Sequence, residues 1–182
     1  MLKKYTIQGK TIQYETITRK IKNPRLDISK GHLTLIIPPQ LENPEQLIEQ
    51  NKKWILSKIE ILENSQNTQL NMNRTQKQLE TIIEKKITQY TQKYKNTPQT
   101  ITYRKMKKRW GSCDSEKNIK FNKTLKYLPE QLINYIIFHE YCHLEELSHN
   151  KNFKKLISRE YPNYKQLDKE ISTYWMAIQK IE

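Results

Sequence analysis

The sequence contains few of the residues that define several common classes of protein. It has two cysteines, Cys113 and Cys142, and three glycines among its 182 residues. Neither cysteine has a C-x-x-C partner, so a cysteine-based metal cluster is not expected, and reduced thiols in a cytoplasm are the default. Collagen-like chains and disulfide scaffolds are excluded because both need far more of these residues.

Long apolar runs are missing as well. No stretch approaches the roughly 20 residues that a membrane-spanning helix needs, and residues 1–6 lack the apolar segment of a secretion signal. We therefore expect a cytoplasmic protein with no membrane partner. Isoleucine, leucine, tyrosine and tryptophan still recur along the chain, which is long enough for one domain, or for one domain with a small appendage.

Acidic residues are outnumbered, because 33 lysines and arginines stand against 19 aspartates and glutamates, for a net charge of +14. Such an excess favours acidic partners, including nucleic acid. The single alanine, Ala177, and the abundance of lysine, asparagine and isoleucine are typical of an AT-rich genome, so a solvated lysine-rich surface is the simpler interpretation. Five of the charges lie at residues 104–109, where a patch for phosphate or an acidic partner and a solvated strand edge both stay open.

The first part of the chain is expected to form a small antiparallel sheet. Residues 12–18 and 33–37 are rich in β-branched and aromatic residues, and Pro38 and Pro39 end the second strand. Residues 30–32 are predicted to form the turn before that strand.

Two helices are predicted to follow this sheet. Pro44 opens the first, whose apolar residues recur at a spacing near 3.6 as far as Leu62. A polar connector over residues 64–73 leads to the second, which runs from about residue 75 to residue 94. We interpret residues 1–95 as an N-terminal β-sheet and helical scaffold region.

The composition changes near residue 100, and short strands and helices are predicted from there. The predicted class is therefore α+β, with residues 96–182 either as a separate core or as part of one continuous domain. The predicted elements are strands at 101–103, 110–114 and 119–122, and helices from Pro129, at 152–160 and from about residue 165.

The helix that follows Pro129 carries the pattern H-E-x-x-H, formed by His139, Glu140 and His143. Histidines four residues apart lie on one face of a helix, so both imidazoles can reach one metal ion. Zinc suits imidazole ligands, and the carboxylate of Glu140 could take a proton from a water that the metal holds. Three of the chain's four histidines lie within eleven residues here, which favours a metal site over surface or core histidines.

The spacing leaves the third ligand open. His149 lies six residues after His143, beyond the helix end expected near residues 147–148, and a turn there could fold it back onto the metal. Glu146 is a rival, although a straight helix presents its side chains in a row and cannot wrap around an ion. His149 is the favoured choice. More distant carboxylates are rivals as well: Glu160 and Glu170.

Neither cysteine is predicted to act in catalysis. Cys142 lies beside His143 but off the ligand face, and we interpret it as a small buried thiol. Nothing in the sequence places Cys113 next to a histidine that would activate it as a nucleophile.

Three stretches of the chain resemble the YgjP-like family of zinc metallopeptidases, which are relatives of the SprT-like proteases. The first is residues 31–62, with K-K-W-I near its end. The second is residues 106–113, which end in W-G-S-C. The third is residues 135–153, with H-E-x-x-H, a later histidine and a phenylalanine, and Pro162 matches the proline that follows in the family.

This resemblance implies a short sheet packed on the H-E-x-x-H helix, as a zincin-like metallopeptidase core over residues 96–182. It implies that His139, His143 and His149 bind Zn²⁺. It also implies that Glu140 is the catalytic base, which activates a metal-bound water to cleave peptide bonds.

The resemblance further implies that the W-G-S strand lies beside the site and pairs with an extended peptide or protein substrate. The alternative is an edge strand with no such role. The substrate-binding residues that it implies are Trp110, Gly111 and Ser112. The candidates to stabilise the oxyanion are Arg109, Tyr141 and Tyr174.

Two other functions stay open. One is a nucleic-acid-associated, SprT-like protease that acts on DNA-bound proteins, with the basic surface as its nucleic-acid contact. The other is a non-catalytic zinc-containing binding module, against which the presence of Glu140 argues.

Overall fold

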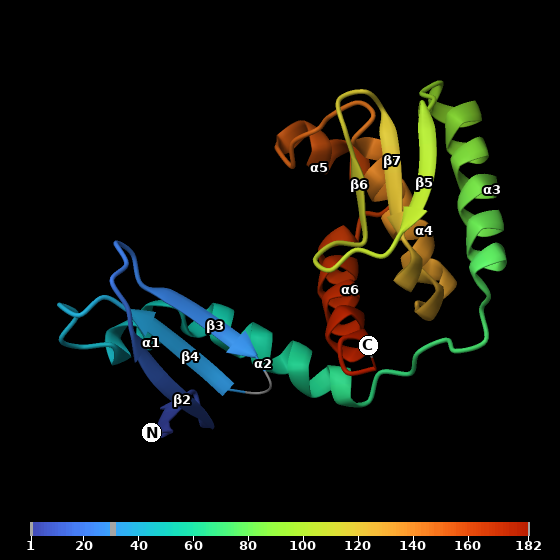
Figure 1. The fold of residues 1–182 in the computed structure, drawn as a ribbon. Coiled ribbons are helices and arrows are strands. Elements are labelled where there is room, and N and C mark those ends of the chain that lie inside the picture. The colour runs from blue at the N-terminus through green and yellow to red at the C-terminus, as the bar shows by residue number, and fades with distance from the viewer. Residues whose placement is uncertain (1, 30–31, 182) are drawn as a thin grey trace. The chain divides into compact units, whose positions relative to one another are not determined.

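The computed structural model describes residues 2–29 and 32–181 of the chain. These residues form two compact units, Met1–Asn67 and Thr68–Glu182. Each unit has its own sheet, its own helices and its own hydrophobic core (Figure 1).

The first unit contains a four-stranded sheet of mixed direction. The prediction of a purely antiparallel sheet is wrong, because β4 lies between β2 and β3 and pairs parallel to β2. Strand pairing of this kind joins distant residues and leaves no local pattern in the sequence. Of the predicted turn, Lys30 and Gly31 lie outside the described residues, and His32 is the first residue of β4. The strands are β1 (Lys3–Ile7), β2 (Lys10–Thr18), β3 (Arg25–Ser29) and β4 (His32–Ile37).

Two helices complete the first unit, where the sequence pattern predicts one. They are α1 (Glu45–Gln50) and α2 (Lys52–Gln66). The interruption falls at Asn51, whose backbone leaves the helical region with φ −112° and ψ 13°. Ile55 of α2 and Tyr14 of β2 are both fully buried in the core of this unit, so the helices and the sheet share one apolar layer.

The second unit begins with a long helix, α3 (Gln76–Tyr94), at the predicted position. The Thr75 hydroxyl accepts a hydrogen bond from the N–H of Gln78, and the Gln78 side chain accepts one from the N–H of Thr75. This reciprocal pair satisfies two backbone donors and fixes the start of the helix. Lys95, with φ of 59°, ends it in the left-handed conformation.

A three-stranded sheet follows α3. β7 is its central strand, parallel to β5 and antiparallel to β6, so β6 lies at an edge. Ile119 and Phe121 on one face of β7 are fully buried, whereas Lys120 between them belongs to the opposite face and is half-buried. The strands are β5 (Thr100–Arg104), β6 (Gly111–Cys113) and β7 (Asn118–Asn122).

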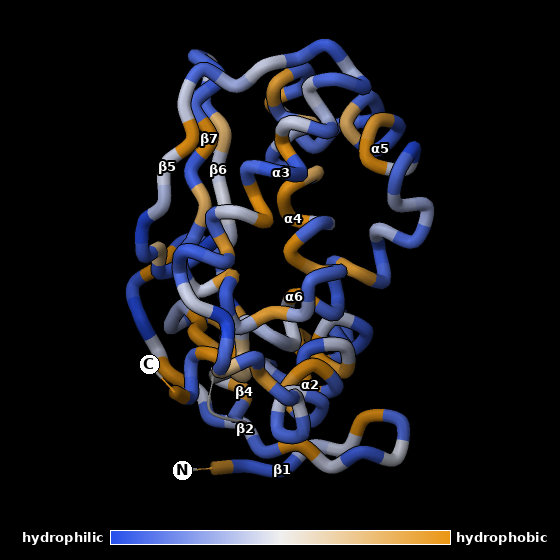
Figure 2. The backbone as a smooth tube through the Cα atoms, turned by 90° about the vertical axis from the view of Figure 1, so that its right-hand side faces the viewer, coloured by the Kyte–Doolittle hydropathy of each residue, from blue (hydrophilic) through white to orange (hydrophobic). Residues whose placement is uncertain are grey.

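The central helix of this unit is α4 (Glu130–Cys142), which follows the 3₁₀ turn η1 (Lys123–Tyr127). It contacts β6, α3, α5 (Lys151–Ile157) and α6 (Tyr164–Ile178). Figure 2 shows hydrophobic residues along much of α4, as expected of a helix that is covered on several sides. The predicted α+β class, with a short sheet against the H-E-x-x-H helix, is confirmed.

The division between the units falls after Asn67, not near residue 95 as the sequence pattern suggests. Helix α3 belongs to the second unit because Leu79, Ile83 and Ile87 lie in the same core as α4. An apolar stripe on a helix shows that it is buried but not against which partner.

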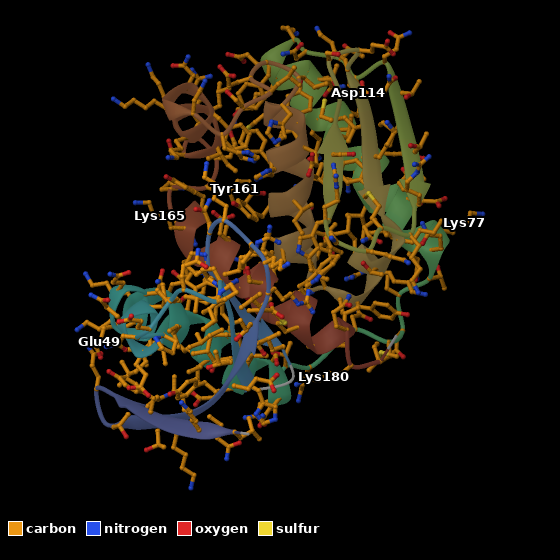
Figure 3. The ribbon with its side chains drawn as sticks, turned by 60° about the vertical axis from the view of Figure 1, so that its left-hand side comes forward. Glu49, Lys77, Asp114, Tyr161, Lys165 and Lys180 are labelled. Carbon is orange, nitrogen blue, oxygen red and sulfur yellow. The ribbon has the colours of Figure 1, made fainter. Side chains whose placement is uncertain are left out.

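The surface of the second unit is strongly charged. Lys77 on α3 and Lys165 on α6 are exposed and project outward in Figure 3. None of the described helices is long and apolar enough to cross a membrane.

We predict that residues 68–182 fold without the first unit and that residues 96–182 do not. The shorter fragment lacks Leu79, Ile83 and Ile87, which are 0%, 0% and 5% exposed in the core. Burial of such a side chain contributes about 1.5–3 kcal/mol, so their loss removes much of the stability of a small domain. Thermal melting followed by circular dichroism measures both fragments, and a cooperative melt of residues 96–182 would contradict the place of α3.

Candidate metal centre

Helix α4 ends at the second histidine of the H-E-x-x-H motif. Its last residue is Cys142 and its C-cap is His143, well before residues 147–148, where the sequence pattern places the end. The backbone N–H groups that follow donate to the carbonyls of Tyr141 and Cys142 and form tight turns. Neither glycine nor proline marks this helix end, so residue type gives no sign of it.

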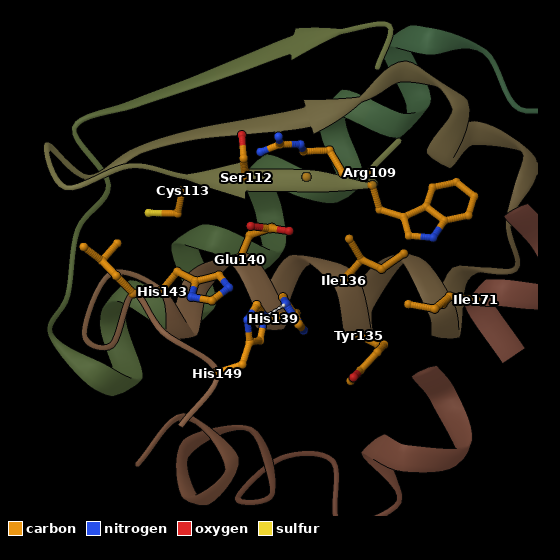
Figure 4. Close-up of a pocket in the computed structure, with 13 residues that line it drawn as sticks. Arg109, Ser112, Cys113, Tyr135, Ile136, His139, Glu140, His143, His149 and Ile171 are labelled. Atoms are coloured by element: carbon orange, nitrogen blue, oxygen red, sulfur yellow. Dashed lines mark hydrogen bonds between the residues drawn. The ribbon is translucent and has the colours of Figure 1, made fainter. Parts of the chain in front are cut away.

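These turns bring His149 back to the face of α4 that carries His139 and His143. His143 Nδ1 donates a hydrogen bond to the carbonyl of Glu146 at 2.9 Å, which ties the turn to the helix. Nε2 of His143 is then the ring nitrogen that can bind a metal ion. The Nε2 atoms of His139 and His149 lie 3.0 Å apart, and Figure 4 shows the three rings close together.

The three imidazoles fit a zinc ion. One ring nitrogen from each of His139, His143 and His149 lies within 4.8 Å of the other two. Tetrahedral zinc with Zn–N distances of about 2.0–2.1 Å places its ligand nitrogens about 3.3–3.4 Å apart. Small ring movements would therefore complete the site, and three protein ligands leave the fourth position that a catalytic zinc site needs.

An aromatic side chain supports the histidine cluster. Phe153 lies against all three rings, with centroid distances of 4.9 Å to His139, 4.6 Å to His143 and 4.7 Å to His149. Phe153 is held in turn by Asn150, whose side chain accepts its backbone N–H at 3.2 Å at the start of α5. This packing restricts the ring orientations and shields one side of the cluster from water.

The rival carboxylates have other partners. Glu146 accepts hydrogen bonds from the Ser148 N–H and hydroxyl at 3.3 and 3.0 Å. Glu160 accepts from Lys93 and Tyr94. Glu170 is an exposed residue of α6. Within residues 2–29 and 32–181, the cluster of possible metal ligands consists of the three histidines.

The helical histidines are held in their neutral form. Burial, reinforced by the neighbouring His143 and His149 rings, lowers the pKa of His139 to about 3. Burial also lowers the pKa of His143. Neutral imidazole is the form that binds a metal ion, so a cation need not displace protons from these two rings.

Glu140 lies between α4 and β6, where its side chain is buried. Burial raises the pKa of its carboxyl group to about 8, against the opposing charge of Arg109, and a nearby cation would lower that pKa again. Gly111 lies directly against it. A Cβ atom at position 111 would be 2.6 Å from Cγ and 2.7 Å from Cδ of Glu140, so any larger residue there would have to displace the Glu140 side chain.

The histidines and Glu140 line a pocket of about 400 Å³ (Figure 4). Trp110, Gly111 and Ser112, predicted to bind substrate, line the same pocket. Ser112 points to the face of β6 opposite Glu140 and lies near the Arg109 guanidinium. The predicted site residues are thus brought together by one helix, one turn and one edge strand.

Sequence reasoning missed several residues of this pocket. Tyr135 and Ile136 precede His139 by four and three residues, so helical spacing could have placed them on its face. Cys113 lies two residues after Gly111 on a strand, so it shares that face of β6. Ile171 comes from α6 and gives no sequence signal. The missed lining residues are Cys113, Tyr135, Ile136, Leu147 and Ile171.

Of the three oxyanion candidates, only Arg109 is among the described residues that line the pocket. Its guanidinium lies on the far side of β6 from Glu140. Tyr141 donates its hydroxyl to the Asn96 carbonyl instead. Tyr174 is half-buried against the core.

The two thiols lie in surroundings that disfavour the thiolate form. Cys113 is in the same pocket as His143, which the sequence could not show, but burial and the nearby Glu140 raise the pKa of its thiol to about 11. A thiol that stays protonated is a poor nucleophile. The interpretation of Cys142 as a buried thiol is confirmed.

The chain is similar to a known protein family and to solved structures. A family model described as "YgjP-like, metallopeptidase domain" matches residues 64–174. No curated protein matches the chain. Among solved structures, the chain is similar to the metallopeptidase zymogen abylysin of Pyrococcus abyssi, with 19% identity over 50% of this chain and 93% of that one, at a TM-score of 0.46. It is also similar to the zymogen jannalysin of Methanocaldococcus jannaschii, with 19% identity over 57% of this chain and 97% of that one, at a TM-score of 0.41.

We predict that Gly111→Ala lowers the free energy of unfolding by about 1–3 kcal/mol, as overpacking of a core typically does. The new methyl group must displace the Glu140 side chain or separate β6 from α4, and unfolding in urea measures the cost. Glu140→Ala removes the atoms that this methyl would meet, so Gly111→Ala should cost much less in that background. Equal costs in the two backgrounds would contradict the contact.

Proposed function

Because this chain belongs to the YgjP-like metallopeptidase family, we propose that it is a zinc-dependent peptidase in which Glu140 acts as general base. The placement of Glu140 carries the proposal. Its buried carboxyl group lies beside three convergent histidines, in a pocket lined by an edge strand. A metal site with a purely structural role has no need of such a group.

His139, His143 and His149 would hold the zinc ion. When bound, the ion supplies a Lewis acid that polarises a substrate carbonyl and lowers the pKa of water in the pocket. The hydrogen bond from His143 Nδ1 to Glu146 orients that ring and fixes its tautomer. Phe153 limits the movement of all three rings.

Glu140 would transfer a proton in two successive steps of the reaction. Its carboxylate accepts a proton from the water that attacks the scissile carbonyl, and the resulting acid gives that proton to the departing amine. The buried position of Glu140 keeps bulk water from competing for the proton. Gly111 makes this possible because it leaves the carboxyl group room between β6 and α4.

The edge strand β6 would bind the substrate backbone. An edge offers unpaired peptide groups with which an extended peptide can form hydrogen bonds. Trp110 and Ile171 line the same pocket and would contact an apolar substrate side chain.

A peptide or protein partner and a cytoplasmic location remain predictions. The two free cysteines suit a cytoplasmic location. Burial of Glu140 against Gly111 disfavours a non-catalytic zinc module, because that carboxyl group is costly to bury without a use.

We predict that Glu140→Gln keeps the zinc ion but lowers kcat/KM for peptide hydrolysis by about 10²–10⁴-fold. Glutamine fills the space beside Gly111 but cannot accept a proton near neutral pH. A peptide library supplies a cleavable substrate, and zinc content is measured on the same preparation as the kinetics. His143→Ala serves as the comparison, because it should lose the zinc ion itself.

Two results would oppose this account. A zinc-loaded Glu140→Gln protein that keeps activity within about tenfold, or roughly 1.4 kcal/mol of barrier, would exclude Glu140 as the base. Loss of zinc from Glu140→Gln would make Glu140 part of the metal site instead.

A further inference from the structure

A second cavity, strongly basic, lies beside the metal-site pocket. It has a volume of about 500 Å³ and is formed by the loop between β5 and β6 and by the outer face of the three-stranded sheet, which carries Lys120. We name it the outer basin. Its basic residues are Arg104, Lys105, Lys107, Lys108, Arg109 and Lys120.

The positive charge of the outer basin is only partly compensated. Lys120 pairs with Asp114 at a distance of 3.2 Å, and Asp114 is labelled at one end of the sheet in Figure 3. A concave surface lined by charges of one sign concentrates the electric field and attracts anionic groups. Within the part of the chain that the structure describes, four of the basic residues form no ion pair: Arg104, Lys107, Lys108 and Arg109.

The loop that carries these charges has a defined shape. The Asn122 side chain is 0% exposed, and its Nδ2 donates to the carbonyls of Met106 and Arg109 at 2.8 and 2.9 Å. Its Oδ1 accepts the N–H of Met106 at 3.3 Å, and its backbone N–H donates to the Trp110 carbonyl at 2.8 Å. Asn122 therefore fixes the backbone of this loop, from which the basic side chains project as exposed groups.

The outer basin and the metal-site pocket lie on either side of β6 and share lining residues. Arg109 and Ser112 line both cavities, and Figure 4 shows their side chains on the side of β6 away from Glu140. Successive side chains of a strand point to opposite faces of the sheet. A peptide paired with the edge of β6 would therefore direct one side chain toward the histidine cluster and the next toward the outer basin.

We propose that the outer basin binds aspartate or glutamate side chains of a polypeptide substrate that lies along β6. This inference rests on the proposed peptidase function and gives it a substrate class, an extended acidic segment with carboxylates at alternate positions near the scissile bond. An acidic peptide is favoured over nucleic acid because the basin joins a strand edge, which pairs with a peptide backbone and not with a phosphodiester chain.

The test measures peptide binding to the zinc-loaded, full-length Glu140→Gln protein, which should not cleave its ligand. The probes are two fluorescent peptides of one sequence, with glutamate or glutamine at alternate positions, followed by anisotropy at low salt. The basin variant is Lys107→Gln with Lys108→Gln. The matched control, Lys77→Gln with Lys85→Gln, removes the same charge from the exposed surface of α3.

We expect the glutamate peptide to bind about tenfold more tightly than the glutamine peptide, as two exposed charge pairs would give. The basin variant should lose this difference and the control should keep it. If both variants lost the affinity difference equally, the effect would be due to net charge alone, and the proposal would be overturned. A DNA oligonucleotide that displaces the glutamate peptide and depends on the same two lysines would also overturn it, in favour of a nucleic-acid surface.

Cleavage assays on the parent protein distinguish a failure of the acidic-substrate proposal from a failure of the proposed peptidase activity. Cleavage of library peptides without any preference for acidic residues would leave the peptidase intact and remove the role of the basin. Basin-dependent binding of the glutamate peptide without cleavage of any library peptide would support the basin and contradict the peptidase.

Discussion

The hydrogen bond from His143 Nδ1 to the carbonyl of Glu146 is the interaction on which the candidate site depends. It fixes the tautomer of His143, so that Nε2 is the ring nitrogen left for a metal ion. It also anchors the turn that follows α4, and this turn returns His149 to within 3.0 Å of His139. Without this turn the chain would supply two histidines on one helix face and no third donor.

A second constraint acts from the opposite side of the site. Gly111 of β6 lies so close to Glu140 of α4 that a Cβ atom there would have to displace the Glu140 side chain, and this contact helps to hold Glu140 beside the histidines. The same strand is the edge of its sheet and the boundary between the metal-site pocket and the outer basin. Buried Asn122 fixes the loop that leads into β6, so one small sheet positions Glu140, the edge strand and the basic surface.

Features set by local sequence could be predicted, and features set by long-range packing could not. The spacing of His139 and His143 placed both on one helix face, and Thr75 with Gln78 marks the start of α3. The parallel pairing of β2 with β4 and the assignment of α3 to the second core depend on contacts between distant residues. The presence of Cys113 in the pocket likewise depends on how β6 packs on α4, which no short window of sequence reveals.

Three imidazoles are proposed to bind zinc in this chain, and X-ray absorption at the zinc K-edge of the full-length protein measures this directly. We predict a first shell of nitrogen or oxygen at about 2.0–2.1 Å, with the multiple scattering of three imidazole rings. The same data on His149→Ala should show two rings. A sulfur shell at about 2.3 Å, which would bring in Cys113 or Cys142, or a parent spectrum with two imidazoles, would contradict the site.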